Sequence, residues 1–388
     1  MFGPGVKMAG RAFTSFSDHP IVPLQLPILM NLLAICLAVT YGLIALALTR
    51  GIVRNEIGSF SNAPSVSVLV AARNAAVHLD VLLEALADQT YEGNLGIYVL
   101  DDRSTDGTAA VAAKWSDRIQ GLRIIPVDRA YHRCGKKNAL EHGIRASDGD
   151  IVLTTDADCR PLPEWIARTV SYFDTHTGAV AGPAPLEGRG WARGLAAFQS
   201  LVVGAIGLGS AGLGYPLTCS GRNFGFRRAA FTDVGGYDSS GHLIGGDDVY
   251  LMRAIAVHRD WDVVYHDDTE AAVPSPAHSD ALWQRHLRYQ SKTLRYGFGT
   301  LMVSLPVYIL HLTLLVAPLI VWWRPDQLPV LLGLAAVKFL TDGVFLYAAA
   351  RRLRQIGLLL WLPIVELISI PYVAVVSAIG AVRPTSWS

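Results

Sequence analysis

Two aspartates, Asp156 and Asp158, stand one residue apart at the end of the short apolar run DIVLTTDADC, residues 150–159. This pattern predicts a strand whose last side chains lie at the carboxyl edge of a sheet, where open α/β sheets bind ligands. Two neighbouring carboxylates suit a hard divalent cation such as Mg²⁺ or Mn²⁺, which usually also binds phosphate oxygens. Solvated turns show the same pattern, so the metal interpretation depends on polar residues elsewhere in the chain.

A second carboxylate pair, Asp101 and Asp102, ends the apolar run of VLDDRSTDGT, residues 99–108. At the end of a strand, such side chains can accept hydrogen bonds from a ribose hydroxyl or a base N–H. The alternative role, capping the following helix, suits Ser104 and Asp106 better. The pair therefore indicates a nucleotide-binding position.

A third pair, Asp247 and Asp248, follows two glycines in GGDDVYLM, residues 245–252, at an expected helix start. A carboxylate there can simply interact favourably with the helix dipole. Alternatively, it can act as a general base directed into a cleft.

A basic helix is expected within QRHLRYQSKTLRYG, residues 284–297, where Arg285, Arg288, Lys292 and Arg295 share one helical face. These cations can neutralise a diphosphate leaving group. Because an apolar segment follows directly, they can also snorkel to lipid headgroups, and the two roles are compatible.

The elements that position these groups alternate along the middle of the chain. Strands are expected within 65–72, 95–102, 122–127 and 150–158, and helices within 78–89, 104–115 and 136–146. Strands that alternate with helices of this length predict an α/β domain with a mostly parallel sheet and right-handed crossovers.

Both ends of the chain are apolar. Residues 26–49 carry no charge and are long enough for a membrane anchor, although a signal peptide is the alternative interpretation. Further spans are expected at about 301–323, 328–350 and 358–380. The basic loop RRLRQ at 351–355 predicts that residues 51–297 are cytoplasmic, whereas Lys7 and Arg11 disagree with that orientation.

Two apolar regions contain features that allow more than one interpretation. Residues 194–221 carry no charge but are rich in glycine, so we interpret them as a buried or membrane-touching helix of the middle domain rather than a span. Lys338, Asp342 and Glu366 fall inside expected spans, where such residues are either functional or paired with one another.

Composition narrows the functional classes. The chain of 388 residues is 51% hydrophobic and 17% charged, with a formal net charge of +1, which does not favour a nucleic-acid partner. Its four cysteines are scattered without a C-x-x-C pair, which argues against a zinc site and suits a reducing compartment.

The ordered set of motifs resembles the membrane-bound family 2 glycosyltransferases of the GT-A fold, over residues 64 to about 297. The resemblance implies a donor site at the ends of the first two strands and at GKKNALEHG, with either Lys136 or Lys137 as its basic residue. The implied nucleotide-sugar contacts are Ala72, Arg73, Asp101, Asp102, Lys136, Lys137, Asp156, Arg285 and Arg288.

The same resemblance implies roles for the remaining motifs. Asp156 and Asp158 would hold the metal as the D-x-D motif, and Asp248, with Asp247 beside it, would be the catalytic base. Tyr289 and Gly246 would contact the acceptor. Tyr289 stands where the family's (Q/R)-x-x-R-W motif has the tryptophan that stacks on an acceptor sugar in processive synthases. This departure disfavours a processive polymerase.

The span arrangement resembles ceramide glucosyltransferases and their bacterial relatives. It implies an anchor and linker at 1–60, a GT-A domain at 61–297 and a transmembrane region at 298–388. The expected function is an inverting transfer from a nucleotide-diphosphate sugar, with a UDP-sugar as the expected donor, to a lipid in a membrane of bacterial inner-membrane type. The alternatives are a processive polysaccharide synthase and a non-catalytic subunit that binds nucleotide sugars.

Overall fold

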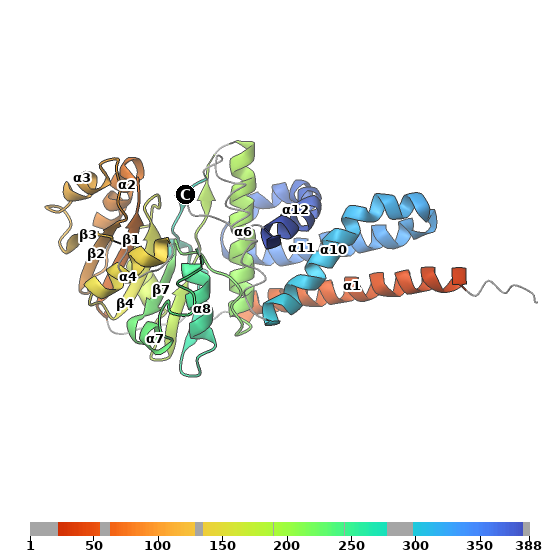
Figure 1. The fold of residues 1–388 in the computed structure, drawn as a ribbon, viewed down its shortest axis with the longest axis horizontal. Coiled ribbons are helices and arrows are strands. Elements are labelled where there is room, and N and C mark those ends of the chain that lie inside the picture. The colour runs from red at the N-terminus through yellow and green to blue at the C-terminus, as the bar shows by residue number, and fades with distance from the viewer. Residues whose placement is uncertain are drawn as a thin grey trace, which may run out of the picture.

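A computed structural model describes residues 22–54, 63–128, 135–188, 190–243, 245–277 and 298–382 (Figure 1). A sheet domain and a group of long apolar helices lie at opposite ends of the molecule, with helix α6 (Trp191–Ala211) between them. The predicted α/β class, a mostly parallel sheet flanked by apolar helices, is confirmed.

Seven strands form the main sheet in the order β3-β2-β1-β4-β7-β5-β8. The strands β1, β2, β3 and β4 are mutually parallel, and β7 is antiparallel to both of its neighbours. Strands β1 and β4 are buried along almost their whole length, as expected for a sheet covered on both faces. The strand bounds are β1 Val66–Ala72, β2 Leu95–Asp101, β3 Leu122–Pro126, β4 Ile151–Asp156, β5 Thr177–Ala181, β7 Phe224–Arg227 and β8 Asp262–Tyr265.

Helices pack on the sheet through the apolar faces that their spacing predicts. In α2 (Ala76–Ala87), Leu79, Leu82, Leu83 and Leu86 are all buried. Two-residue strands β6 (Leu186–Glu187) and β9 (Ser275–Pro276) pair beside the main sheet. The other helices of the domain are α3 Thr108–Ala113, α4 Lys136–Ala146, α5 Trp165–Val170, α7 Arg228–Asp233 and α8 Asp247–Ala256.

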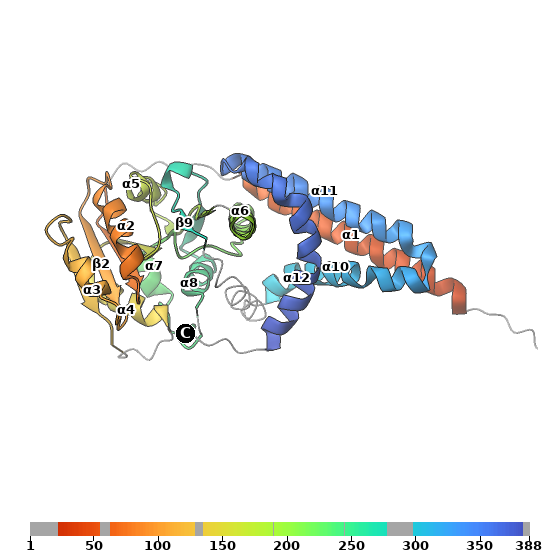
Figure 2. The same cartoon turned by 90° about the horizontal axis from the view of Figure 1, so that it is seen from above.

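The apolar ends form helices α1 (Val22–Arg54), α10 (Phe298–Trp323), α11 (Leu328–Arg352) and α12 (Leu362–Val382). Five helices of the described chain, α6 among them, are long and apolar enough to cross a membrane. Figures 1 and 2 show α1, α10 and α11 side by side, whereas α12 runs across α10 and α11. The expected C-terminal segments are therefore helical, but they do not form one parallel set.

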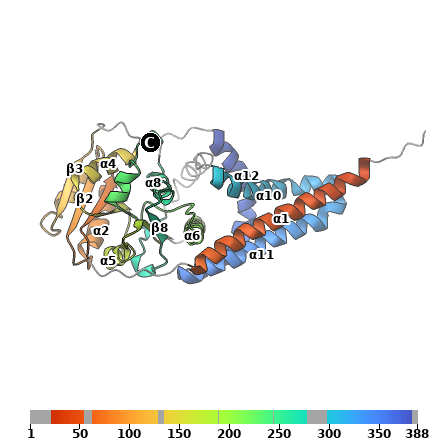
Figure 3. The same ribbon diagram turned by 90° about the horizontal axis from the view of Figure 1, so that it is seen from below.

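Helix α6 is packed on both sides. Its Phe198 and Leu208 belong to one apolar core with Phe226 of β7. Ile52 of α1 and Phe345 of α11 belong to the same core, and Figure 3 shows α6 between the sheet domain and those two helices. This uncharged stretch thus joins the two parts of the molecule.

Glycines allow α6 and α1 to touch through their backbones. A Cβ atom built on Gly209 would lie 2.5 Å from the carbonyl oxygen of Leu48, and Cβ atoms on Gly51 or Gly212 would overlap main-chain atoms of the other helix. Backbone atoms cannot rotate away as side chains do, so these glycines fix how closely the helices approach.

We expect Gly209→Val to lower the thermal midpoint of the purified protein by several degrees, because overpacking costs about 1–3 kcal/mol. Gly333→Val is the matched control, since that helical glycine of α11 has no atom within 4 Å of an added Cβ. Differential scanning fluorimetry in detergent measures both variants. Equal midpoints for the two variants would contradict the close approach.

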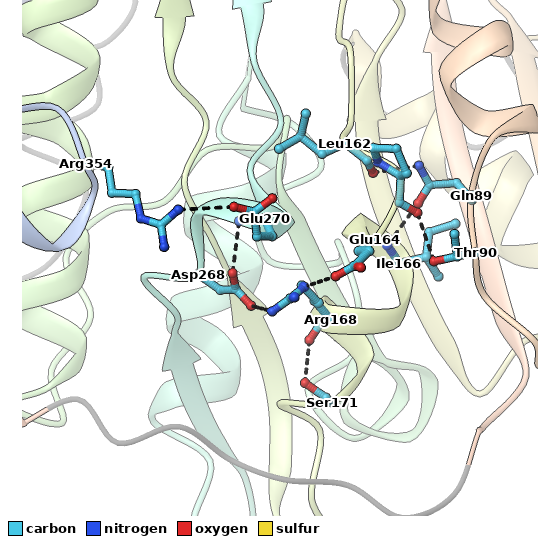
Figure 4. Close-up of polar contacts among 11 residues, drawn as sticks. Gln89, Thr90, Leu162, Glu164, Ile166, Arg168, Ser171, Asp268, Glu270 and Arg354 are labelled. Atoms are coloured by element: carbon cyan, nitrogen blue, oxygen red, sulfur yellow. Dashed lines mark hydrogen bonds and ion pairs between the residues drawn. The ribbon is translucent and has the colours of Figure 1, made fainter.

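A polar contact also joins the sheet domain to the end of α11. Arg352 Nη1 lies 2.8 Å from Asp267 Oδ2, and Arg354 Nη1 lies 3.2 Å from Glu270 Oε1. Figure 4 shows Arg354 reaching Glu270, beside Asp268, which pairs with Arg168 of α5 at 3.0 Å. Two cations of the expected basic loop therefore bind the domain.

The charged residues inside the apolar helices pair with one another. Lys338 Nζ lies 2.9 Å from Asp342 Oδ2 and also pairs with Glu366 of α12. Tyr41 of α1 donates a hydrogen bond of 2.6 Å to Asp342 Oδ1. Of the two interpretations left open by the sequence, this geometry favours pairing within the helix group.

Candidate active site

The carboxyl ends of β2, β1 and β4 bring the predicted nucleotide and metal groups to one edge of the sheet. Strand register places Ala72 opposite Asp101 and Ala71 opposite Asp156. Arg73, immediately after β1, is exposed. The two carboxylate pairs predicted from local sequence thus flank the end of β1.

The loops that follow β1 and β2 are tied together by side-chain hydrogen bonds. Asn74 Oδ1 accepts from the Thr105 N–H at 2.9 Å, and Asp106 Oδ2 accepts from the Ala76 N–H at 3.1 Å. A hydrogen bond from the Thr108 hydroxyl lowers the pKa of Asp106. The residue at the cap position of α3 is Gly107, which has no side chain, and Asp106 Oδ1 accepts from the N–H of Thr108, the first residue of the helix, at 3.1 Å.

The predicted nucleotide carboxylates lie beside these loops. Asp101 Oδ1 accepts from the Ser104 N–H at 3.0 Å, and the mostly buried Asp102 pairs with Arg103 at 2.7 Å. Both side chains therefore have fixed positions at the sheet edge.

Lys136, the first residue of α4, joins two of the motifs. Its Nζ lies 2.6 Å from Asp156 Oδ1 and 3.6 Å from Asp247 Oδ2. Burial alone would lower the pKa of Lys136, but Asp156, Asp247 and Asp248 outweigh it and raise that pKa above its usual value. The ammonium group therefore remains charged, and it neutralises part of the carboxylate cluster.

Asp248 is oriented by two main-chain donors. Its Oδ2 accepts from the Gly221 N–H at 2.6 Å, and its Oδ1 accepts from the Val249 N–H at 2.7 Å. The carbonyl oxygen of Gly221 is itself held by the Thr154 hydroxyl of β4 at 3.1 Å. The carboxylate is therefore fixed relative to the central sheet.

Sequence reasoning missed Gly221. A Cβ atom there would lie 3.4 Å from Asp247 Oδ2, from Asp248 Oδ2 and from Lys136 Nζ, so this glycine stands at the centre of the charged cluster. The only signal in the sequence is the polar turn SGRN, residues 220–223, at the end of the uncharged stretch.

The glycine pair before α8 has the backbone conformation that favours glycine. Gly245 and Gly246 have φ values of +66° and +69°, and α8 begins at Asp247, as the sequence predicts. Gly246, predicted to contact the acceptor, is thus the residue that turns the chain so that Asp247 and Asp248 fall in the first turn of the helix.

The two adjacent lysines of α4 have different surroundings. Whereas Lys136 enters the carboxylate cluster, Lys137 is fully buried and donates to the carbonyl oxygens of Ser240, Leu243 and Gly245 at 2.7, 2.9 and 3.0 Å. Of the two candidates for the basic nucleotide contact, Lys136 is the one in the cluster. The buried position of Lys137 argues against direct contact with a nucleotide.

The predicted metal ligands suit a hard cation that shares its coordination with a substrate. Asp156 and Asp158 are both partly exposed at the end of β4. Within the described ranges, no three His, Cys, Asp or Glu side chains gather closely enough to hold a metal by themselves. Mg²⁺ is commonly held by one or two carboxylates plus phosphate oxygens and water, so this donor set fits a metal bound together with a diphosphate.

Arg285, Arg288 and Tyr289, with the rest of the expected basic helix, lie outside the described residues.

Comparisons with known proteins identify the family that most of the sheet domain matches. The family model described as Glycosyl transferase family 2 matches residues 67–235. Glycosyltransferase AglE of Haloferax volcanii is 34% identical over 112 residues, which cover 29% of this chain and 36% of that protein. Beta-monoglucosyldiacylglycerol synthase of a Nostoc species is 27% identical over 321 residues, which cover 75% of this chain and 66% of that enzyme.

One solved structure has a similar fold along most of the chain. It is the mannosyltransferase PcManGT from Pyrobaculum calidifontis in complex with GDP-Man and Mn²⁺, with a TM-score of 0.59 and 21% identity. The similarity covers 90% of this chain and 98% of that one. The region that the family model matches, residues 67–235, contains all of β1 except Val66, together with β2, β4 and the cluster residues Lys136 and Asp156. The chain therefore contains a Glycosyl transferase family 2 domain with the GT-A fold.

Proposed function

We propose that the protein is an inverting glycosyltransferase that moves a sugar from a nucleotide-diphosphate sugar to a membrane lipid. The proposed donor is a UDP-sugar. The observation that carries the proposal is the cluster of Lys136, Asp156, Asp247 and Asp248, at the edge of a family 2 domain that is packed on apolar helices. The cluster combines cationic and anionic groups, and phosphate binding and proton transfer require both.

In this proposal, the donor lies across the ends of β1, β2 and β4. Asp101 and Asp102 accept hydrogen bonds from the nucleoside, and Arg73 lies beside them. Asp156 and Asp158 would hold Mg²⁺ or Mn²⁺, which offsets the charge of the diphosphate when it is bound. Lys136 adds a fixed positive charge next to Asp156, where it attracts the phosphate oxygens.

Asp248 is the proposed base. The acceptor hydroxyl loses its proton to the Asp248 carboxylate while its oxygen forms a bond to the anomeric carbon. The bond between that carbon and the diphosphate oxygen breaks, and the nucleoside diphosphate leaves with the electron pair. One displacement from the opposite face inverts the configuration. Main-chain hydrogen bonds from Gly221 and Val249 orient the carboxylate, so little reorganisation precedes the transfer.

A lipid acceptor is proposed because of the surroundings of the domain. Helix α6, between the metal and base motifs in sequence, packs against α1 and α11, so the sheet domain lies directly beside apolar helices. The Nostoc relative is named for a glycolipid product. We therefore propose that one sugar, or very few, is added to a lipid hydroxyl or lipid phosphate.

The test uses purified protein in lipid vesicles with labelled UDP-glucose, UDP-galactose, UDP-N-acetylglucosamine and GDP-mannose, followed by separation of organic and aqueous phases. The expected result is label from one donor in an organic-soluble glycolipid of discrete size. A ladder of long water-soluble polymer would instead identify a processive synthase. Nucleotide-sugar binding without transfer to any extracted lipid would identify a non-catalytic binding subunit.

A further inference from the structure

The segment before α8 is held by a lysine that has no part in the proposed chemical step. Lys137 is the second residue of α4 and is fully buried. Its ammonium group lies within hydrogen-bond distance of three carbonyl oxygens, those of Ser240, Leu243 and Gly245. An ammonium group has three N–H donors, so it can donate to all three of these oxygens at once.

These contacts of Lys137 lie directly before helix α8, which carries Asp247 and Asp248. Gly245 directly precedes Gly246, the cap residue of α8, which has no side chain to fix the start of the helix. The Lys137 ammonium also lies 5.1 Å from the centre of the Tyr250 ring, in the first turn of α8. One cation thus contacts the chain on both sides of Asp247 and Asp248.

The neighbouring lysine connects the same two helices at the site itself. Lys136, at the first position of α4, contacts the side chain of Asp247. Lys137, at the second position, donates to the main chain at Gly245, just before α8. Adjacent residues of a helix point about 100° apart, so one helix start can contact both the acidic side chains and the main chain that carries them.

We infer that Lys137 is a positioning residue, which fixes the main chain at Ser240, Leu243 and Gly245 and thereby the place of the Asp248 carboxylate. The inference rests on the proposed function for its effect on transfer, but the contact itself can be measured without a substrate. Burial of the Lys137 charge costs free energy. Three charge-assisted hydrogen bonds and the ring of Tyr250 offset that cost.

The test compares Lys137→Met, which keeps length and burial but removes the donors, with Lys137→Arg, which keeps a cation and donors. Leu140→Ala is the matched control, because Leu140 is buried on the same helix and its side chain has no polar group. All three are made in the full chain in lipid nanodiscs. Amide hydrogen exchange of the α8 peptide 246–256 is followed by mass spectrometry, with no nucleotide added.

Lys137→Met should speed exchange in the α8 peptide by about tenfold or more relative to wild type. In Leu140→Ala, the same peptide should exchange more slowly than in Lys137→Met. Lys137→Arg should restore part of the protection. With the donor that supports transfer, Lys137→Met should lower kcat by about 10–100-fold with little change in the donor KM, because a small displacement of the base costs rate.

Unchanged exchange in Lys137→Met would overturn the contact, and unchanged kcat despite faster exchange would overturn the positioning role. A large rise in donor KM with normal kcat would indicate that Lys137 binds the nucleotide, and it would also overturn the proposal. If the wild type transfers no sugar, the proposed function fails, while the exchange experiment still decides the contact. Should Lys137→Met not fold, Lys137→Leu, which also lacks donors, gives the same comparison with Lys137→Arg.

Discussion

Asp248→Asn is expected to bind the nucleotide sugar nearly as well as wild type and to lose transfer by about 10²–10⁴-fold. Asparagine keeps the shape of the side chain and can still accept a hydrogen bond from the Gly221 N–H, but it cannot take a proton from the acceptor. Steady-state transfer to lipid and equilibrium binding of UDP separate the two effects.

Asp247→Asn is the control for that experiment. Asp247 lies in the same turn and 3.6 Å from Lys136, so its loss should alter charge balance more than proton transfer. If Asp247→Asn is the inactive variant and Asp248→Asn remains active, the base has been assigned to the wrong carboxylate.

The second large effect concerns the metal. EDTA is expected to stop transfer, and added Mn²⁺ or Mg²⁺ should restore it. Asp158→Ala should weaken UDP binding by at least about tenfold, because one lost charged contact costs about 1.5–3 kcal/mol. Isothermal titration with UDP, with and without Mn²⁺, measures the change.

Asp117→Ala, on the surface of the same domain and away from the predicted motifs, serves as the control for removal of a carboxylate. It should keep the metal response of the wild type. Full activity of Asp158→Ala in the presence of EDTA would refute the metal role and leave Lys136 as the cation beside the diphosphate.

Local sequence predicted the sheet edge well, for a physical reason. A buried strand is a short apolar run, and the polar residues that follow it must lie at its end, so Asp101, Asp102 and Asp156 could be placed without knowledge of the packing. The same reasoning placed Asp247 at the start of α8, because the two glycines before it favour the turn that begins the helix.

Local sequence could not predict the contacts between segments that are distant along the chain. Nothing local pairs Lys136 with Asp247, or Gly221 with Asp248, because those contacts depend on how α4, β4 and α8 pack. The separate surroundings of Lys136 and Lys137 also follow from packing rather than composition. Hydropathy likewise gave the length of α12 but not its direction, since helix direction is set by the neighbouring helices.

The shared apolar core has a consequence for how the protein is made. Ile52 of α1, Phe345 of α11 and Phe226 of the sheet belong to one cluster, so both apolar helices contribute to the apolar core on one side of the sheet domain. Residues from near both ends of the described chain must therefore meet before that core is complete. We therefore expect a chain truncated before α11 to leave the side of the sheet that carries Phe226 without part of its apolar cover.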